Sequence, residues 1–311
     1  MRVLVTGGAG FIGAHVCRRL TEQGDEVVAL DDLSTGFRSN LDGAGVTLHV
    51  GSILDVELVS ELVATADSVI HLAAAVSVPN SVADPVGTNE VNVTGTLNVL
   101  QAARARAVHT VLASSSAVYG TSTEVPTHED LVPRPISPYA VSKLAAESYG
   151  LAFAENYRLP VLAFRFFNVY GPLQSPAHAY AAVVPSFVSA LLNGRPLRVF
   201  GDGRQSRDFT SVSSLVTVLV DAVERRVTHD RPVNLAFGTS TTLLELIACL
   251  QRLTGLTATV EHSEPRAGDV RISQADSTLL RSLFPQLSPH DLEDGLAETI
   301  AWFRATNAAQ A

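Results

Sequence analysis

The first half of the chain alternates short apolar runs with longer stretches in which apolar residues recur at helical spacing. We expect strands at Arg2–Thr6, Glu26–Asp31, Val46–Val50, Ser68–His71, Thr110–Ala113 and Val161–Phe166. We expect helices at about 11–23, 55–65, 84–107 and from Ser137 onward. Such regular alternation predicts an α/β fold, in which a doubly wound parallel sheet is covered by helices on both faces.

The pattern changes after about residue 170, where the alternation becomes irregular. We expect a loop at 174–180, helices at 183–192, to about 224, to about 253 and at 291–305, and a short strand at 197–201. Ser213 or Ser214 is a candidate cap for the second of these helices, and Thr241 or Thr242 for the third. We therefore divide the chain into 1–170, to which parts of 204–236 return, and a smaller mixed α/β region at 171–311.

Four glycines, at positions 7, 8, 10 and 13, follow the first predicted strand and open the first predicted helix. Gly7 permits a tight turn, Gly10 lets a pyrophosphate approach the backbone, and Gly13 allows the helix to pack closely on the strand. The free N–H groups at the start of the helix attract an anion. An ordinary strand-to-helix turn is the alternative. The context favours nucleotide binding and a Rossmann-type sheet.

Asp31 and Asp32 end the second predicted strand, about 20 residues beyond the glycine turn. A carboxylate at this place accepts hydrogen bonds from the adenosine ribose and repels a 2′-phosphate. The pair therefore favours NAD over NADP, and Arg38 is the nearest cation that would reverse this preference. Simple capping of a loop is the alternative.

Small and hydroxyl side chains follow two further strands. His71 is followed by Leu72, Ala73 and Ala74, and the fifth strand leads into Ser114–Ser116. Ligands bind at the carboxyl ends of parallel strands in open α/β sheets, so these residues are candidates for a binding site. Alanine packing and a serine-rich turn are the alternatives. Asn92 is a polar residue on the inner side of the helix expected at 84–107.

Tyr139 and Lys143 lie four residues apart just after Ser137 and Pro138, which suit the cap and first position of a helix. The two side chains therefore share one helix face. An ammonium beside a phenol lowers the pKa of the phenol, which would make Tyr139 a general base. Taken alone, the pair favours a surface tyrosine packed on a lysine stem, because this spacing occurs by chance on many helices.

Composition limits the remaining classes of function. The chain has 311 residues, of which 46% are hydrophobic, and a net charge of −9, which disfavours nucleic acid as a partner. It has no apolar run long enough to cross a membrane, so we expect a cytoplasmic protein without a signal peptide. Cys17 and Cys249 are expected to be buried free thiols, and no metal site is expected.

Together these motifs resemble those of the extended short-chain dehydrogenase/reductase family, and most closely the NAD-dependent UDP-sugar 4-epimerases. The resemblance covers nearly the whole chain. The motifs that carry it are Thr6–Gly13, Asp31–Leu33, His71–Ala74, Ser114–Ser115, Tyr119–Gly120, Tyr139 with Lys143, Arg165 with Asn168–Pro172, Phe200–Gly203, Arg207–Asp208 and Arg266–Asp269. The resemblance implies a tightly held NAD in the first region, an NDP-sugar substrate in the second, and a homodimer built on two long helices.

The resemblance also implies roles for individual residues. Tyr139 takes the proton of the sugar 4-hydroxyl, Ser115 hydrogen-bonds the 4-oxygen, and Lys143 holds the nicotinamide ribose. The expected cofactor-binding residues are Gly7, Gly10, Phe11, Ile12, Asp31, Asp32, Ser34, Thr35, Gly36, Ser52, Ile53, Leu72, Ala73, Ala74, Asn92, Tyr139, Lys143 and Phe166. The expected substrate-binding residues are Ser77, Ser115, Ser116, Tyr139, Asn168, Val184, Val199, Phe200, Arg207, Arg266, Asp269 and Ser273.

Two departures from the family pattern bear on the activity. Family dehydratases carry an acid and a base after the catalytic hydroxyl, where this chain has Ser116 and Ala117, so the sequence argues against a 4,6-dehydratase. The segment after Phe209 also differs from the family pattern, being Thr210–Ser214. A different NDP-sugar dehydratase or reductase, and a non-catalytic dinucleotide sensor, remain as alternatives. The sequence does not name the sugar or the base.

Overall fold

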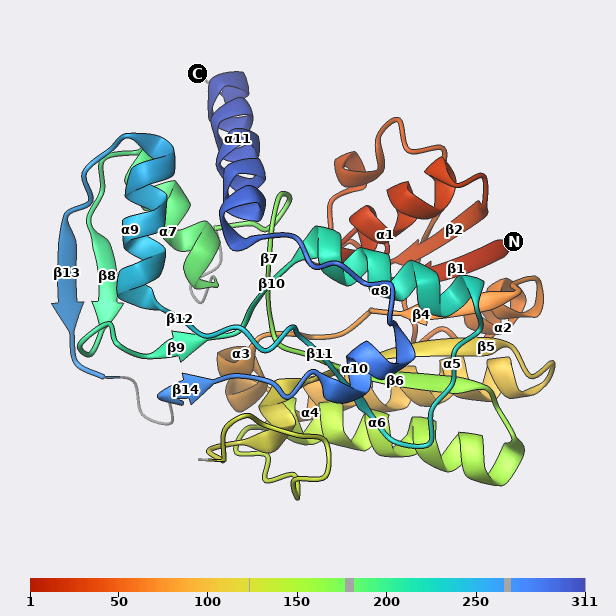
Figure 1. The fold of residues 1–311 in the computed structure, drawn as a ribbon. Helices are drawn as coiled ribbons and strands as arrows, with labels where there is room; N and C mark the ends of the chain where they lie inside the picture. The colour runs from red at the N-terminus through yellow and green to blue at the C-terminus, as the bar shows by residue number, and fades with distance from the viewer. Residues whose placement is uncertain (123, 177–181, 266–269, 311) are drawn as a thin grey trace.

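A seven-stranded parallel sheet forms the centre of the molecule (Figure 1). The computed structural model describes residues 1–122, 124–176, 182–265 and 270–310, with side chains up to residue 306. The strand order is β11-β6-β5-β4-β1-β2-β3. The strands are β1 (Arg2–Thr6), β2 (Glu26–Asp31), β3 (Thr47–Val50), β4 (Ser68–His71), β5 (His109–Ser115), β6 (Val161–Phe166) and β11 (Val233–Leu235). This confirms the expected doubly wound α/β fold.

The direction of winding reverses between β1 and β4, which are neighbours in the sheet. In register, Thr6 lies opposite Leu30 of β2 on one side and opposite His71 of β4 on the other. The residues that follow Thr6 and His71 therefore leave the sheet side by side. A ligand crevice forms at such a reversal in open α/β sheets.

Helices cover both faces of this sheet (Figure 1). On one face lie α1 (Phe11–Glu22), α8 (Val212–Glu224) and α10 (Thr278–Leu283). On the other lie α2 (Val56–Ala64), α5 (Gly95–Arg104) and α6 (Pro138–Tyr157). Short helical turns at η1 (Arg38–Leu41) and η3 (Ser116–Tyr119) follow β2 and β5. Cys17 and Cys249 are buried free thiols, as expected.

The single helix expected at 84–107 was wrong in detail. The segment comprises α4 (Pro85–Asn89), a π-helical turn η2 (Glu90–Thr94) and α5, and it is preceded by α3 (Val78–Ala83). Asn92 lies in the π turn, where its side chain accepts a hydrogen bond from the Ala75 N–H at 2.7 Å and donates to the Ala75 carbonyl at 3.0 Å. A π turn re-aims one side chain without ending the helix, which is how Asn92 reaches the segment after β4.

The part of the second region that lies away from the main sheet contains short strands and the helices α7, α9 and α11. Figure 1 shows α7 (Val183–Leu192), α9 (Leu243–Thr254), β8 (Leu197–Phe200) and β13 (Val260–Ser263) together at the end of the molecule away from the N-terminus. The other elements are α11 (Leu292–Gln310), the pair β7 (Asn168–Tyr170) and β10 (Phe209–Ser211), and the trio β12 (Thr241–Thr242), β9 (Ser206–Arg207) and β14 (Ile272–Ser273). Most of these strands were not predicted, because two or three residues are too few to show a period.

The helix caps give one confirmation and one correction. Thr242 caps α9 in a reciprocal capping box with Glu245, as one of the two predicted options. Ser211, and neither Ser213 nor Ser214, caps α8, because its hydroxyl accepts from the Ser214 N–H at 3.2 Å.

The division of the chain into 1–170 and 171–311 stays a proposal. In the structure α8 packs on α1, and β11 pairs with β6. No helix within the described ranges is both long enough and apolar enough to cross a membrane.

Candidate active site

Tyr139, Ser115 and Lys143 meet where the amino end of α6 passes the carboxyl end of β5. Ser137 caps α6 by accepting from the Ala140 N–H at 3.2 Å, and Pro138 occupies its first turn, as predicted. The Ser115 hydroxyl lies close enough to the Tyr139 phenol to lower its pKa in part. The Lys143 Nζ donates to the Ala113 carbonyl at 2.7 Å. A hydroxyl, a phenol and an ammonium are thus gathered at one strand end, which is what proton transfer at an alcohol requires.

The expected lowering of the Tyr139 pKa was wrong, because the net shift of this pKa is upward. Burial raises the pKa of the Tyr139 phenol, and the Ser115 hydroxyl lowers it in part. Burial also lowers the pKa of Lys143 to about 8, so the ammonium is itself poorly stabilised in this environment. A cation whose own charge is disfavoured gives little help to a neighbouring phenolate, and the sequence does not reveal this burial.

The glycine turn after β1 admits no side chain. Gly7 has a φ of +70°, and a Cβ added to it would lie 2.8 Å from the Ala73 nitrogen. α1 begins at Phe11 and Ile12 behind Gly10, and no side chain in the described part of the chain caps it. Its first N–H groups therefore remain available to an anion. The turn and these N–H groups have the form of a pyrophosphate cradle, which fits the expected dinucleotide.

The two aspartates after β2 have different surroundings. Asp31 is buried and accepts from the Ala9 N–H at 2.9 Å and the Leu33 N–H at 2.8 Å, so it holds the glycine turn. Burial raises the pKa of this carboxyl. Asp32 is exposed and accepts from the Ser34 N–H and hydroxyl at 2.9 and 2.6 Å. The adjoining Thr35 is exposed, whereas Gly36 is buried against Ala9.

His71 joins β1 to α5 through hydrogen bonds to Thr6 and Thr96, and this link was not predicted from the sequence. Thr96 donates its hydroxyl proton to the Asn92 carbonyl, so the His71 Nε2 donates to Thr96 at 3.0 Å. The His71 Nδ1 then accepts from Thr6 at 2.7 Å, and the Thr6 hydroxyl accepts from the Ala73 N–H at 3.3 Å. Burial lowers the pKa of His71 to about 3, so the ring stays neutral as this chain of bonds requires.

The other expected cofactor residues occupy several positions around the sheet. Leu72, Ala73 and Ala74 follow β4 and are partly buried. Ser52 is also partly buried after β3, and its hydroxyl accepts from the Leu54 N–H, whereas Ile53 is buried against Gly95. Phe166 lies at the carboxyl end of β6, beside Ser115 in the register of the sheet.

The expected substrate residues divide into two groups. Arg207 and Ser273 are register partners in the neighbouring strands β9 and β14, and the Asn168 Nδ2 donates to the Asp208 carbonyl at 3.4 Å. The Arg207 Nη1 donates to the Ser206 and Val270 carbonyls at 2.8 and 2.7 Å. These two hydrogen bonds fix the orientation of the guanidinium. Ser77 caps α3, and Ser116 opens η3 directly after Ser115.

The second group lies in the core or beyond the described residues. Val184 and Val199 are fully buried in the apolar core of the second region, and Phe200 ends β8 with partial exposure. Because both valines are fully buried, they can support a binding surface from the core beneath it. Arg266 and Asp269 lie outside the described residues.

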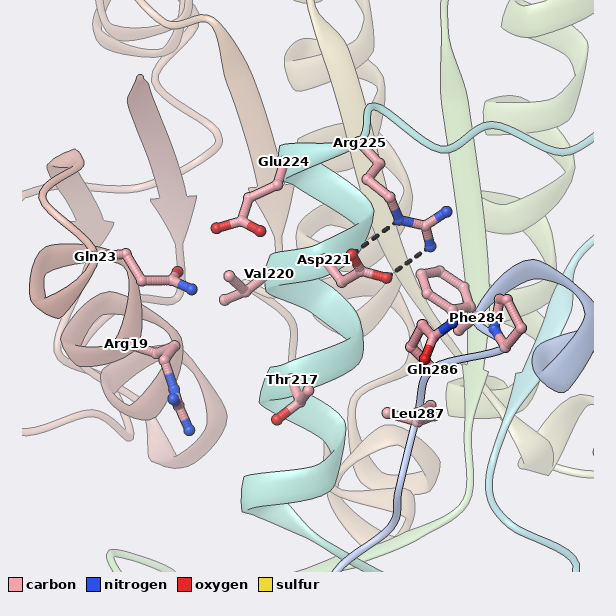
Figure 2. A pocket seen from close by; sticks show the side chains of 11 residues that line it. Arg19, Gln23, Thr217, Val220, Asp221, Glu224, Arg225, Phe284, Gln286 and Leu287 are labelled. Carbon is pink, nitrogen blue, oxygen red and sulfur yellow. Dashed lines mark hydrogen bonds and ion pairs between the residues drawn. The ribbon is translucent and has the colours of Figure 1, made fainter.

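A hollow of about 400 Å³ lies elsewhere, between α1, α8 and residues 284–287 (Figure 2). Arg225 in this hollow forms a two-point ion pair with Asp221 at 2.6 and 2.8 Å, and its guanidinium lies 5.0 Å above the Phe284 ring. The hollow contains none of the expected site residues, so we assign the chemistry to the crevice at β1, β4 and β5.

The chain is similar in sequence and in structure to several known proteins. A model of the NAD dependent epimerase/dehydratase family matches residues 3–236. A UDP-glucose 4-epimerase of Mycolicibacterium smegmatis is 39% identical over 98% of this chain and 99% of its own. A solved UDP-N-acetylglucosamine 4-epimerase from Methanobrevibacter ruminantium, in complex with UDP-N-acetylmuramic acid, aligns with a TM-score of 0.93, 35% identity and 98% coverage of both chains. A Thermus thermophilus UDP-glucose 4-epimerase in complex with NAD aligns with a TM-score of 0.88, 36% identity and coverage of 98% and 99%.

Proposed function

Since the chain belongs to the NAD dependent epimerase/dehydratase family, we propose that it inverts C4 of a sugar nucleotide through a transient 4-keto sugar. The observation that carries the proposal is the meeting of Ser115, Tyr139 and Lys143 at the carboxyl end of β5. A protein that only senses a dinucleotide needs no general base beside that end of the strand, so the trio favours an enzyme.

The residues divide the work of proton transfer. Tyr139 removes the proton from the 4-hydroxyl and later returns it. Ser115 hydrogen-bonds the sugar 4-oxygen while the charge on that oxygen changes. When bound, NAD would supply the hydride chemistry at C4, as both the acceptor and the later donor of one hydride. Lys143 would orient the nicotinamide ribose through its free N–H donors.

The residues present fit NAD. Lys143 is buried and, among the described residues, donates one hydrogen bond, to Ala113. An ammonium has three donors, so two remain for ribose hydroxyls. The glycine turn admits only backbone and offers N–H groups to a pyrophosphate, and the exposed Asp32 is available to the adenosine ribose.

The residues after Ser115 disfavour elimination. The Ala117 side chain carries no base for the C5 proton, and its N–H donates to the Ser115 hydroxyl at 3.1 Å. Ser116 is a poor acid for expelling water, because its hydroxyl is far less acidic than a carboxyl. Dehydration of an NDP-sugar therefore stays the second candidate, behind epimerisation.

We infer that the substrate is a UDP-sugar, since the named relatives act on UDP-glucose or UDP-N-acetylglucosamine. Arg207, with Asn168 and Arg266, is the proposed partner of the diphosphate, because a guanidinium binds phosphate oxygens in pairs. Val199 and Phe200 are proposed to lie near the base, and Ser273 near the sugar. Glucose, its N-acetylated form and its uronic acid form all remain possible substrates.

We also propose a homodimer that forms on α3, α4 and α6. These helices contact one another, and Val82, Val86 and Val141 on them are 52–67% exposed. Such a patch is typical of a protein interface, and a second copy would bury it on α6, the helix that carries Tyr139. The cytoplasmic location is likewise a proposal and rests on the sequence.

The test of the proposed function needs no added cofactor. The purified protein is denatured, the released dinucleotide is identified, and the native protein is assayed on a panel of UDP- and dTDP-sugars. We expect NAD to be released, and we expect the C4 epimer to form from at least one UDP-sugar. Loss of water from the sugar would support the dehydratase instead, and binding of NAD without any turnover would support a sensor.

A further inference from the structure

One ridge of α6 is fastened along β5 by a series of contacts. The helix residues on this ridge are spaced by three or four, so they form one face. From the amino end of α6, the contacts are Tyr139 with the Ser115 hydroxyl, Lys143 with the Ala113 carbonyl, Glu147 with the Ser114 hydroxyl, and Gly150 against Leu112. A Cβ added to Gly150 would lie 2.3 Å from the Leu112 Cδ1, so the helix cannot approach the strand more closely.

The Glu147 carboxylate is the most firmly held group on this ridge. Its Oε1 accepts from the Arg165 Nη2 at 2.6 Å, and its Oε2 accepts from the Arg165 Nε at 2.9 Å and from the Ser114 hydroxyl at 2.6 Å. Both charged side chains are only 3% exposed. A two-point pair fixes direction as well as distance. Because Ser114 and Arg165 are register partners in β5 and β6, α6 is fixed to both strands at once.

Arg165 also holds the segment that follows Ser115. Its Nη1 donates to the Glu129 carbonyl at 3.3 Å, and its guanidinium lies 4.7 Å above the Tyr119 ring of η3. The Tyr119 hydroxyl donates to Asn234 at 2.6 Å, beside β6 in β11. The strand end, the turn after it and the helix opposite therefore share one buried guanidinium.

We propose that Glu147 and Ser114 are positioning residues, which set the height of α6 along β5 and so hold the Tyr139 phenol at the Ser115 hydroxyl. This proposal rests on the proposed epimerase function. Glu147 lies eight residues beyond Tyr139, about 12 Å along the helix axis, so it acts through the helix and touches no reacting atom. A misplacement of about 1 Å at a reacting group can cost about a hundredfold in rate.

The decisive variant is Ser114→Ala, because Glu147→Gln would leave Arg165 buried and unpaired and is prone to misfold. Ser114→Ala removes one hydrogen bond and leaves the ion pair. The matched control is Thr110→Val, since Thr110 is a buried β5 residue whose hydroxyl donates to the Val108 carbonyl at 2.9 Å rather than to α6. Each variant is measured for melting temperature, NAD content, kcat and KM.

We expect Ser114→Ala to lower kcat about tenfold, with KM and NAD content within about twofold of the wild type. Thr110→Val should lower the melting temperature to a similar extent but keep kcat within about twofold. A kcat for Ser114→Ala near that of the wild type would overturn the proposal, and so would an equal loss in both variants, which indicates general destabilisation. A wild type inactive on every NDP-sugar would instead overturn the proposed function and this proposal with it.

Discussion

A Cβ added to Gly13 in α1 would lie 2.1 Å from the carbonyl oxygen of Gly7. The start of α1 is therefore pressed directly onto the glycine turn, and this closeness places the first N–H groups of the helix over the crevice. Gly13 is buried and its neighbour in the turn is backbone, which cannot rotate away as a side chain can.

Gly13→Ala should therefore displace α1 and abolish retention of NAD through purification, because the pyrophosphate cradle is lost. The matched control is Gly24→Ala, since Gly24 has a φ of +89° and open space around it. Strain of about 1 kcal/mol is expected there, without loss of NAD. The measurement is the dinucleotide released on denaturation per mole of protein. Full NAD content in Gly13→Ala would contradict the assignment.

Tyr139→Phe should lower turnover by about 10²–10⁴-fold, because general acid–base catalysis contributes that much. NAD content should stay unchanged, since the ring remains and only the hydroxyl is removed. Tyr149→Phe, on an exposed position of the same helix, is the control and should keep full activity. Activity of Tyr139→Phe within threefold of the wild type would remove this residue from the mechanism.

The sequence predicted the main sheet well because each of its strands, except β11, is a short segment with adjacent or alternating apolar residues beside a periodic helix. The prediction failed where a single hydrogen bond, backbone conformation or degree of burial decides the local structure. The π turn at Asn92 depends on hydrogen bonds to Ala75, seventeen positions earlier in the chain. Ser211 is the cap because its backbone is extended, with a φ of −63° and a ψ of 142°, and because its hydroxyl accepts from the Ser214 N–H. The direction of the pKa shift of Tyr139 depends on burial, which no local pattern encodes.

The same distinction applies to the candidate site. The glycine turn, Ser115, Tyr139 and Lys143 form recognisable motifs, so the sequence could name them. The polar chain through Thr6, His71 and Thr96 joins residues with no fixed spacing, and only the pairing of β1 with β4 brings Thr6 beside His71.

NAD should bind more tightly than NADP, because Asp32 is exposed beside Ser34 and a second negative group would be repelled there. Protein freed of dinucleotide is titrated with each cofactor. Arg38→Ala tests the nearest opposing cation and should leave the preference unchanged. Equal affinity for the two cofactors would contradict the assignment of the ribose, whereas a preference for NAD that increases in Arg38→Ala would show that Arg38 opposes it.

Stability should fall below pH 6.5 in part because of His71. Its pKa is about 3 in the folded chain and about 6.5 when unfolded, so between these values the unfolded chain binds a proton that the folded chain does not. The contribution is fully present above pH 6.5 and is lost as the pH falls toward 3. Between pH 7 and 5 this amounts to about 2 kcal/mol. Denaturant unfolding of His71→Gln at the two pH values should show a pH effect smaller by about that amount; an unchanged difference would show that His71 is protonated alike in both states.

Ser273 should decide whether an N-acetylated sugar is accepted. Ser273 is partly buried and lies opposite Arg207 in register, whereas the adjacent Ile272 is exposed. A small side chain leaves room for an N-acetyl group at C2, so the wild type should convert UDP-GlcNAc as well as UDP-glucose. Ser273→Tyr should lower activity on UDP-GlcNAc selectively, since overpacking costs about 1–3 kcal/mol, or about 5- to 150-fold in rate. Ile272→Tyr is the matched control and should change neither rate, because its side chain points toward solvent. An equal loss on both sugars in Ser273→Tyr, or no conversion of UDP-GlcNAc by the wild type, would exclude Ser273 as the residue that sets the size of the pocket.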